Sequence, residues 1–237
     1  MTNGDALLAS IFAAPDEDTP RLVYADWLDE NGQPARAEFI RVQVEIARMV
    51  LHARQPLNVE TAGLLAREKT LLVTHRENWL APLYEKGEPL DSGSTHGQFR
   101  RGFVEIVWMR ATRFLSHAER LFQLCPVREL RVTTRTTPDE FAALLASPFL
   151  RMLDSLDLSD VRLGKTAPRI VSHSHFASAL RILRLRGCGI TDEGAHLLAR
   201  VPFEWPLREL DVAFNPIGPV GLAALYKRFG TAVRNTL

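Results

Sequence analysis

The chain has 237 residues, of which 46% are hydrophobic and 24% are charged, a balance typical of a globular protein with a sizeable core. It has only two cysteines, no basic leader followed by an apolar run, and no apolar stretch of about 18 residues. These features argue against a disulfide-stapled secreted domain and a membrane protein, so we expect a cytoplasmic protein with no membrane partner.

The net charge of +1 is unevenly distributed along the chain. Residues 1–97 carry 9 basic and 15 acidic residues, a balance of −6, whereas residues 98–237 carry 20 and 13, a balance of +7. This asymmetry indicates either two surfaces with different partners or two halves that partly neutralise each other where they touch. The second interpretation is the simpler one.

Residues 1–84 are expected to form an all-helical domain, because apolar side chains recur there with helical spacing. The expected helices cover residues 5–14, 21–30, 34–54 and 58–78. Thr19 and Pro20 predict an N-cap and a first-turn proline for the second helix, and Asn31 with Gly32 predicts its end.

Part of this segment has a specific motif. Residues 20–32 read PRLVYADWLDENG and residues 36–43 read RAEFIRVQ. Together they closely resemble the bacterial repeat-companion domain, a short helical module at the N-terminus of repeat proteins, over about residues 4–52. The resemblance implies that repeats follow, and it implies no activity. We interpret the helical domain partly as a cap for those repeats.

Residues 85–102 are rich in Gly, Pro, Ser and charge and are expected to be a connector loop. Beyond them, one phrase of the form apolar-x-x-apolar-x-apolar begins at residues 103, 127, 153, 180 and 207. The steps of 24, 26, 27 and 27 residues predict a solenoid, in which each phrase is a short strand and a helix follows.

The last two phrases continue in a shared register. Their matching positions are Leu180, Leu183, Leu185, Cys188 and Ile190, and then Leu207, Leu210, Val212, Asn215 and Ile217. The pattern resembles the leucine-rich repeat, over about residues 103–230, with Cys188 and Asn215 at its Asn/Cys position. Ala111, Arg135 and Val161 occupy that position in the first three repeats. We expect Cys188 and Asn215 to turn inward and bond to free backbone groups.

Fold class follows from these two parts. We predict an α/β chain in which an N-terminal helical domain precedes a repeat domain over residues 103–237. That domain is a short leucine-rich repeat solenoid of about five repeats, with parallel strands on the concave face and helices outside. Thr137 and Glu140 predict a capping box for one return helix, and residues 226–237 are expected to close the C-terminal end.

In this fold the residues between the strand leucines point outward from the concave sheet. The candidate protein-binding residues are Glu105, Met109, Glu129, Arg131, Asp157, Arg184, Arg186, Glu209 and Asp211. The sequence therefore favours a non-enzymatic scaffold for protein-protein interaction, with an unknown protein partner and an oligomeric state that it does not specify. The alternative is that these charges pair laterally and only keep the sheet in solution.

Two other functional classes are disfavoured. No nucleophile-elbow, phosphate-loop or His-Glu-x-x-His motif occurs, and the close histidine pair His173 and His175 lacks a third ligand. The acidic cluster at residues 16–18 lacks the glycine and later ligands of a calcium loop. Nucleic-acid binding by the basic half is disfavoured because aromatic residues are not interleaved with the arginines. We therefore expect no catalytic or metal-binding residues and no cofactor.

Overall fold

The computed structural model describes residues 2–52, 59–85, 88–89, 97–133, 136–161, 176, 179–201 and 205–235. The chain divides into two compact units. The first contains Met1–Pro89, Gly97–Glu105 and Phe122–Pro126, and the second contains Leu90–His96, Ile106–Leu121 and Val127–Leu237.

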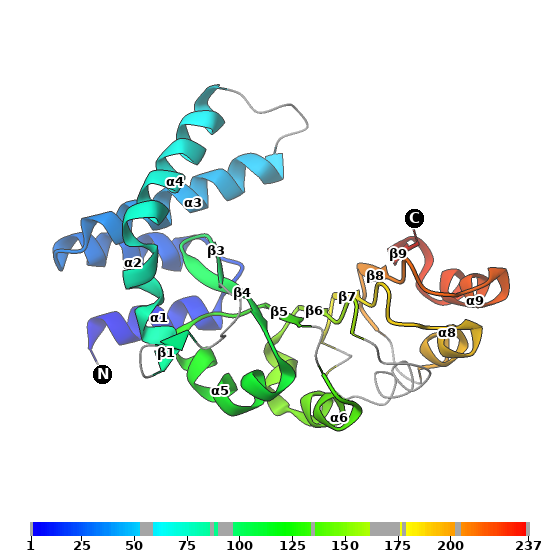
Figure 1. Ribbon diagram of the computed structural model, residues 1–237. Coiled ribbons are helices and arrows are strands. Elements are labelled where there is room, and N and C mark those ends of the chain that lie inside the picture. Colours follow the sequence, from blue (N-terminus) through cyan, green and yellow to red (C-terminus); the bar gives the residue numbers. More distant parts are fainter. Residues whose placement is uncertain are drawn as a thin grey trace. The chain divides into compact units, whose positions relative to one another are not determined.

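The first unit is mainly helical (Figure 1). Its helices are α1 (Asn3–Ala13), α2 (Thr19–Glu30), α3 (Pro34–His52) and α4 (Val59–Leu80), followed by a 3-10 turn at Ala81–Leu83. The expected start of α2 is wrong by one residue, since Thr19 lies inside the helix. Asp18 occupies the N-cap position and makes no capping hydrogen bond through its side chain.

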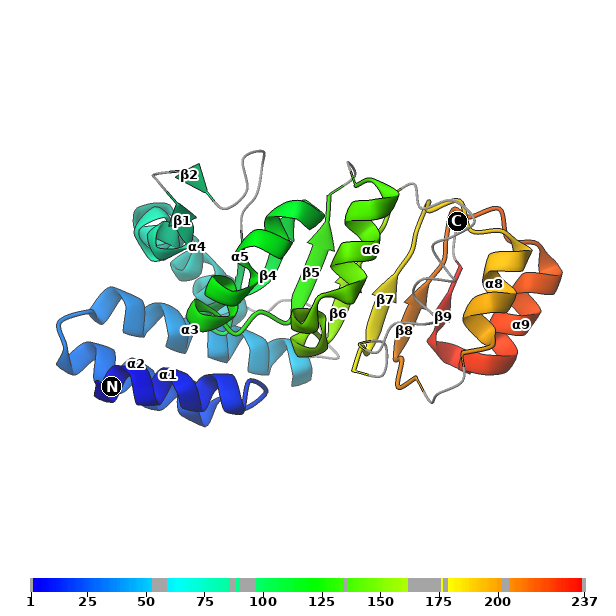
Figure 2. The ribbon, with the colours of Figure 1, turned by 90° about the horizontal axis from the view of Figure 1, so that it is seen from below.

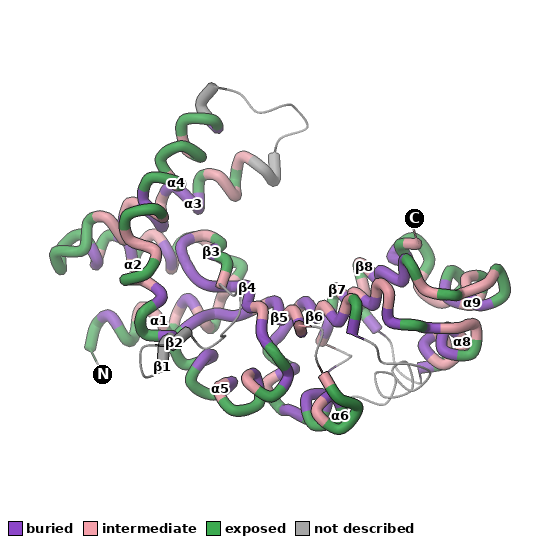
Figure 3. Tube along the Cα trace, in the orientation of Figure 1, coloured by how far each residue is buried: buried purple, intermediate pink, exposed green. Residues whose placement is uncertain are grey.

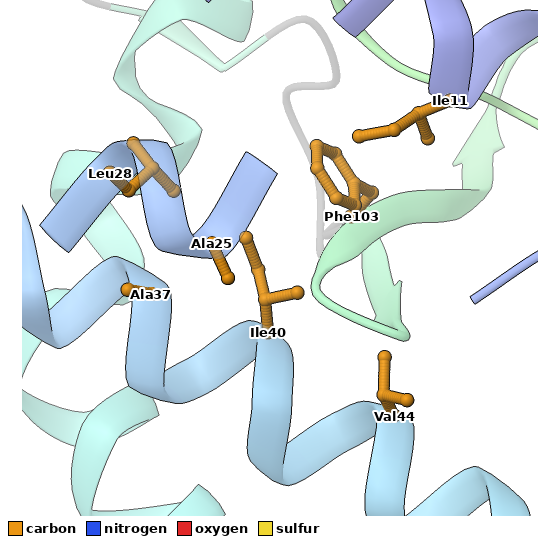
Figure 4. Packing of buried hydrophobic residues seen from close by; sticks show 7 residues of the cluster. All are labelled: Ile11, Ala25, Leu28, Ala37, Ile40, Val44 and Phe103. Atoms are coloured by element: carbon orange, nitrogen blue, oxygen red, sulfur yellow. The ribbon is translucent and has the colours of Figure 1, made fainter. Parts of the chain in front are cut away.

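Helices α1, α2 and α3 share a core with the start of strand β4 (Figure 4). The seven side chains of this core are at most 4% exposed, and they are Ile11, Ala25, Leu28, Ala37, Ile40, Val44 and Phe103. Burying one large aliphatic or aromatic side chain contributes roughly 1.5–3 kcal/mol. The helical spacing seen in the sequence therefore corresponds to one packed face on each helix.

The expected connector at residues 85–102 contains short strands. They are β1 (Tyr84–Glu85), β2 (Glu88–Pro89) and β3 (Gln98–Arg100), and β1 and β2 pair antiparallel. Phe99 is buried between two exposed neighbours in β3, which is the alternation of a strand with one packed face. The loop prediction missed β3 because only three residues carry that alternation.

The second unit is a sheet covered by helices on one face (Figures 1 and 2). The strands are β4 (Phe103–Met109), β5 (Glu129–Val132), β6 (Ser155–Asp157), β7 (Ile182–Arg184), β8 (Glu209–Asp211) and β9 (Val233–Arg234), each parallel to the next. The helices are α5 (Ala111–Leu124), α6 (Pro138–Ala146), α8 (Asp192–Ala199) and α9 (Pro219–Phe229), with 3-10 turns at Pro148–Met152 and Gly230–Ala232.

One row of apolar residues runs across the strands and faces the helices. Its paired members are Val107, Leu130, Leu156, Leu183, Leu210 and Val233, and all are at most 6% exposed. Figure 3 shows buried residues along these strands, whereas the helices expose their outer sides. The predicted inward leucines are confirmed for β5 to β8. The closing segment, expected to be a cap, supplies a sixth parallel strand, β9.

The register of β4 corrects one part of the prediction. The sequence phrase aligned Ile106 with Leu130, but Ile106 pairs with Glu129, and Val107 pairs with Leu130. Because side chains alternate along a strand, a shift of one residue moves each side chain to the opposite face. Glu105 and Met109 therefore share the inward side with Val107, and both are buried. Their predicted place on the outward face is wrong.

Candidate functional site

The side chains of β4–β9 that point away from the helices form what we call the open face. Its central row, in strand order, is Trp108, Arg131, Asp157, Arg184, Asp211 and Arg234. A second row contains Glu129 and Glu209, and the strand ends add Arg186 and Phe214. Arginine and aspartate thus alternate across neighbouring strands, where paired side chains lie close enough to interact.

Glu129 lies beneath two arginines of the open face. Its Oε1 atom accepts hydrogen bonds from Arg131 Nε at 2.6 Å and from Arg184 Nη1 at 3.2 Å. Arg184 Nε also donates to Glu209 Oε1 at 2.8 Å. Burial acts to lower the pKa of Arg184, but the carboxylates of Glu209 and Glu129 outweigh it and raise that pKa. The guanidinium of Arg184 is therefore held in place as a cation.

The aspartates of the central row also accept hydrogen bonds from the backbone. Asp157 Oδ1 accepts from the Ser159 N–H at 2.9 Å, and Asp211 Oδ1 accepts from the Ala213 N–H at 3.0 Å. The second oxygen of Asp211 accepts from Arg186 Nη1 at 2.9 Å. These bonds satisfy backbone groups where each strand becomes a loop and orient the carboxylates.

Two arginines of the open face stack on aromatic rings. The Arg131 guanidinium lies 4.8 Å from the centre of the Trp108 ring, and the Arg186 guanidinium lies 4.7 Å from that of Phe214. Cation–π contacts of this kind contribute about 0.5–1 kcal/mol at exposed sites. They also place each guanidinium group against an apolar ring.

Phe214 has an unfavourable backbone conformation. Its φ angle is 57°, and the equivalent positions after β6 and β7 hold Asp160 at 60° and Gly187 at 60°. The left-handed region suits glycine and tolerates aspartate, but a bulky side chain there costs about 1–2 kcal/mol. The Phe214 side chain is nonetheless 56% exposed. Its burial therefore offsets little of that cost.

Seven of the nine candidate residues lie on the open face, and Glu105 and Met109 do not. The structure adds three residues that the sequence interpretation missed, which are Trp108, Phe214 and Arg234. Trp108 was missed with the β4 register. The sequence did contain a signal for the strand that holds Arg234. Leu210 and Val233 are 23 residues apart, the same step that separates Val107 from Leu130. The two end repeats are shorter than the inner ones.

The inward turn residues behave as the repeat pattern predicts. Asn215 Nδ2 donates to the carbonyl oxygens of Leu185 at 2.7 Å and Val212 at 2.8 Å, and its Oδ1 accepts from the Ile190 N–H at 2.9 Å. Cys188 Sγ lies 3.1 Å from the Leu158 carbonyl oxygen. The capping box of Thr137 and Glu140 is also confirmed. These contacts fix the loops that follow the strands.

The motif in the helical unit has a second polar cluster. Arg21 Nη2 lies 2.6 Å from Glu105 Oε1, and its Nη1 donates to the Arg101 carbonyl oxygen at 3.2 Å. Gln43 Oε1 accepts from the Gly102 N–H at 2.7 Å, and Arg36 donates to the Gly102 carbonyl oxygen. The motif residues thus hold the turn between β3 and β4.

Gly102 is required at this turn. Its φ angle is 88°, and a Cβ atom there would lie 2.9 Å from the Cα atom of Ile40. Arg36 also stacks within 5.5 Å of four rings, which are Phe39, Trp79, Phe99 and Phe103. Burial lowers the pKa of Arg36 to about 10, so the side chain is still a cation near neutral pH.

The described part of the chain holds no group of three or more His, Cys, Asp or Glu side chains that could ligate a metal ion. His173 and His175 lie outside the described residues. Cys125 and Cys188 are free and buried, and burial raises the pKa of each thiol to about 12. Neither thiol has the depressed pKa of a catalytic nucleophile.

Comparison with known proteins supports the repeat interpretation for part of the chain. Residues 178–199 and 206–225 match the leucine-rich repeat family model, so leucine-rich repeats are present over these residues. No curated protein matches the chain. Within the described ranges, no helix combines the length and apolar character needed to cross a lipid bilayer.

Proposed function

We propose that the chain is a non-enzymatic protein-interaction module that binds a protein partner on the open face. The observation that carries the proposal is Phe214, a large apolar side chain that is half exposed at a strained backbone position and stacked under Arg186. Lateral charge pairing would keep the sheet in solution, but it gives no reason for this side chain. Aromatic and arginine residues are enriched among those that dominate binding energy at protein interfaces.

The repeats support the same proposal. A leucine-rich repeat match favours an interaction module, and the open face presents side chains from the strands and from the turns that directly follow them. Arg131, Arg184 and Arg186 are each fixed by a carboxylate or a ring. Little side-chain entropy would therefore be lost when a partner binds.

The finer architecture is part of the proposal. Residues 103–237 would form a short solenoid, and residues 1–84 would be a repeat-companion domain that caps it. Support comes from the β3–β4 turn, which the side chains of Arg21, Arg36 and Gln43 hold. Strand β4 starts at that turn, and its later residues pair with β5. The helical domain would thus fix the first strand of the repeat sheet.

Affinity capture with matched variants tests the function. The immobilised full-length chain is incubated with the cytoplasmic fraction of its source cells, beside an open-face variant with Arg184→Glu and Phe214→Asn. The control carries Arg200→Glu and Tyr226→Asn, two exposed positions on the helical side of the repeats. It makes the same kinds of change away from the open face.

We expect a stoichiometric partner that wild type and control retain and the open-face variant loses. The captured protein is then purified, and titration calorimetry should give an affinity about tenfold or more weaker for the open-face variant. A partner that all three proteins retain with equal affinity would place the binding surface elsewhere.

A further inference from the structure

We infer that the partner segment on the open face is acidic and that its carboxylates bind to the stacked arginines. This inference rests on the proposed function and adds the chemistry of the partner. It comes from a difference between the formal charge of the open face and the charge that the open face presents to solvent.

The strand residues of the open face, together with Arg186, are formally neutral. They carry four carboxylates, on Glu129, Asp157, Glu209 and Asp211, and four guanidinium groups, on Arg131, Arg184, Arg186 and Arg234, while the exposed Asp160 lies in the turn after β6. The two signs are not equally exposed, however. The side chains of Glu129, Asp211, Asp157 and Glu209 are 3%, 11%, 16% and 30% exposed, whereas those of Arg184, Arg131 and Arg186 are 23%, 33% and 39% exposed. The accessible charge is therefore mainly positive.

The arginines also have more unused hydrogen-bonding groups than the carboxylates have. Glu129 accepts from two arginines, and Asp211 accepts from Arg186 and from a backbone N–H. A guanidinium has five N–H donors. Among the described residues, Arg131 donates a side-chain hydrogen bond only from its Nε atom, and Arg186 donates one only from its Nη1 atom. Both retain paired donors for a further acceptor, while the buried carboxylates are already occupied.

The aromatic rings favour carboxylate as that acceptor. The guanidinium carbons of Arg131 and Arg186 lie over the rings of Trp108 and Phe214, so each ring shields one side of a guanidinium and leaves its remaining N–H groups to an acceptor on another side. Two parallel N–H donors of a guanidinium match the two oxygens of a carboxylate. An aromatic or aliphatic residue beside the acid could contact the exposed part of Phe214.

A protein segment fits better than a nucleic acid. The Glu209 side chain is 30% exposed between the arginines, so a uniform row of phosphates would meet a negative charge there. An acidic protein segment can instead place its carboxylates at the arginines and a donor at Glu209. The alternating central row thus favours a partner with separately placed charges.

A random peptide library tests this inference on the intact chain. Peptides of about a dozen residues, which are longer than the width of the six-strand row, are selected on the wild-type protein and sequenced. The enriched peptides are then titrated against Arg131→Glu/Arg186→Glu and against Arg200→Glu/Lys227→Glu. The second variant makes the same change in net charge at two exposed positions on the helical side. Circular dichroism checks that both variants are folded.

We expect the selected peptides to be enriched in Glu and Asp next to an apolar residue. Their affinity should fall about tenfold or more for the first variant, stay the same for the second, and decrease as salt is added. Peptides without acidic enrichment that nevertheless lose binding to the first variant would overturn the acidic partner and leave the proposed function standing.

Two results would overturn both claims. One is the absence of any selected peptide whose binding depends on open-face residues. The other is tight binding of single-stranded DNA or RNA homopolymers that only the first variant abolishes, since this would assign the face to phosphates.

Discussion

The Nη2 atom of Arg21 lies 2.6 Å from Oε1 of Glu105, and neither side chain is more than 4% exposed. Burial lowers the pKa of Arg21 and raises that of Glu105, because a poorly solvated site disfavours both charges. Each charge is tolerated mainly because the other is present. This pair joins the helical motif to the start of β4.

Removing one partner of this pair is therefore expected to be costly. Glu105→Leu leaves the Arg21 cation buried and should lower the free energy of unfolding by about 3–5 kcal/mol. Adding Arg21→Met to Glu105→Leu should recover most of that loss, because no unpaired charge remains. Urea denaturation of the three proteins measures the difference. Equal losses of unfolding free energy in the single and double variants would contradict the claim that each charge is tolerated because the other is present.

Asn215 should contribute more to stability than Cys188. Asn215→Ala leaves several backbone groups without their partner, whereas Cys188→Ala removes one donor from the Leu158 carbonyl oxygen. Each unsatisfied buried group costs about 1–3 kcal/mol. Thermal unfolding should rank Asn215→Ala below Cys188→Ala, with exposed Asn78→Ala as an unaffected control. The reverse ranking would contradict the role of the inward turn residue.

Phe214→Asn should separate stability from binding. Asparagine tolerates the left-handed conformation, so the backbone strain of about 1–2 kcal/mol is partly released. The lost stack with Arg186 offsets about 0.5–1 kcal/mol of this gain. We expect an unfolding free energy that is unchanged or slightly higher, while partner affinity falls. A clear loss of stability would mean that Phe214 is retained for packing.

The two thiols should be unreactive in the folded protein. A thiol reagent at neutral pH should label neither Cys125 nor Cys188 until denaturant is added, because both are buried and their pKa is raised to about 12. Rapid labelling of either residue without denaturant would contradict the burial that the structure shows.

The raised thiol pKa values also predict a pH dependence. Thiols in the unfolded chain lose their protons near pH 9.0, the ordinary value, whereas the folded chain holds them to about 12. As pH rises between these two values, the unfolded chain releases thiol protons that the folded chain retains. The unfolded state therefore becomes more stable relative to the folded state. The free energy of unfolding should fall between these pH values, and Cys125→Ala with Cys188→Ala should make the fall less steep. An identical slope would contradict the pKa shift.

The sequence predicted the repeats best where one side of each strand is apolar. In β6 and β8, a leucine lies between two polar residues, so only one register buries the leucine. In β4, the run Phe103–Met109 is apolar on both sides except for Glu105, and that single charge favours the register that turns Glu105 outward. The pattern does not show that Glu105 pairs with the buried Arg21, and Glu105 and Met109 were misplaced for that reason.

The candidate site was only partly predictable for a related reason. Alternation indicates which residues share a face, but it does not show how far each side chain is covered. Glu129 and Arg131 were equivalent candidates in the sequence, yet the Glu129 carboxylate lies under two guanidinium groups. A sequence signal for the strained conformation of Phe214 was overlooked, since the repeat register aligns Phe214 with Gly187 and glycine favours the left-handed region.

Site-specific photo-crosslinking tests the central claim most directly. A photoreactive phenylalanine analogue is placed at Trp108 or Phe214 on the open face, and at Val220 or Tyr226, exposed positions of helix α9. After irradiation with the captured partner, we predict covalent adducts from the two open-face positions and none from the two helix positions. Adducts from α9 alone would contradict the proposal that the partner binds to the open face.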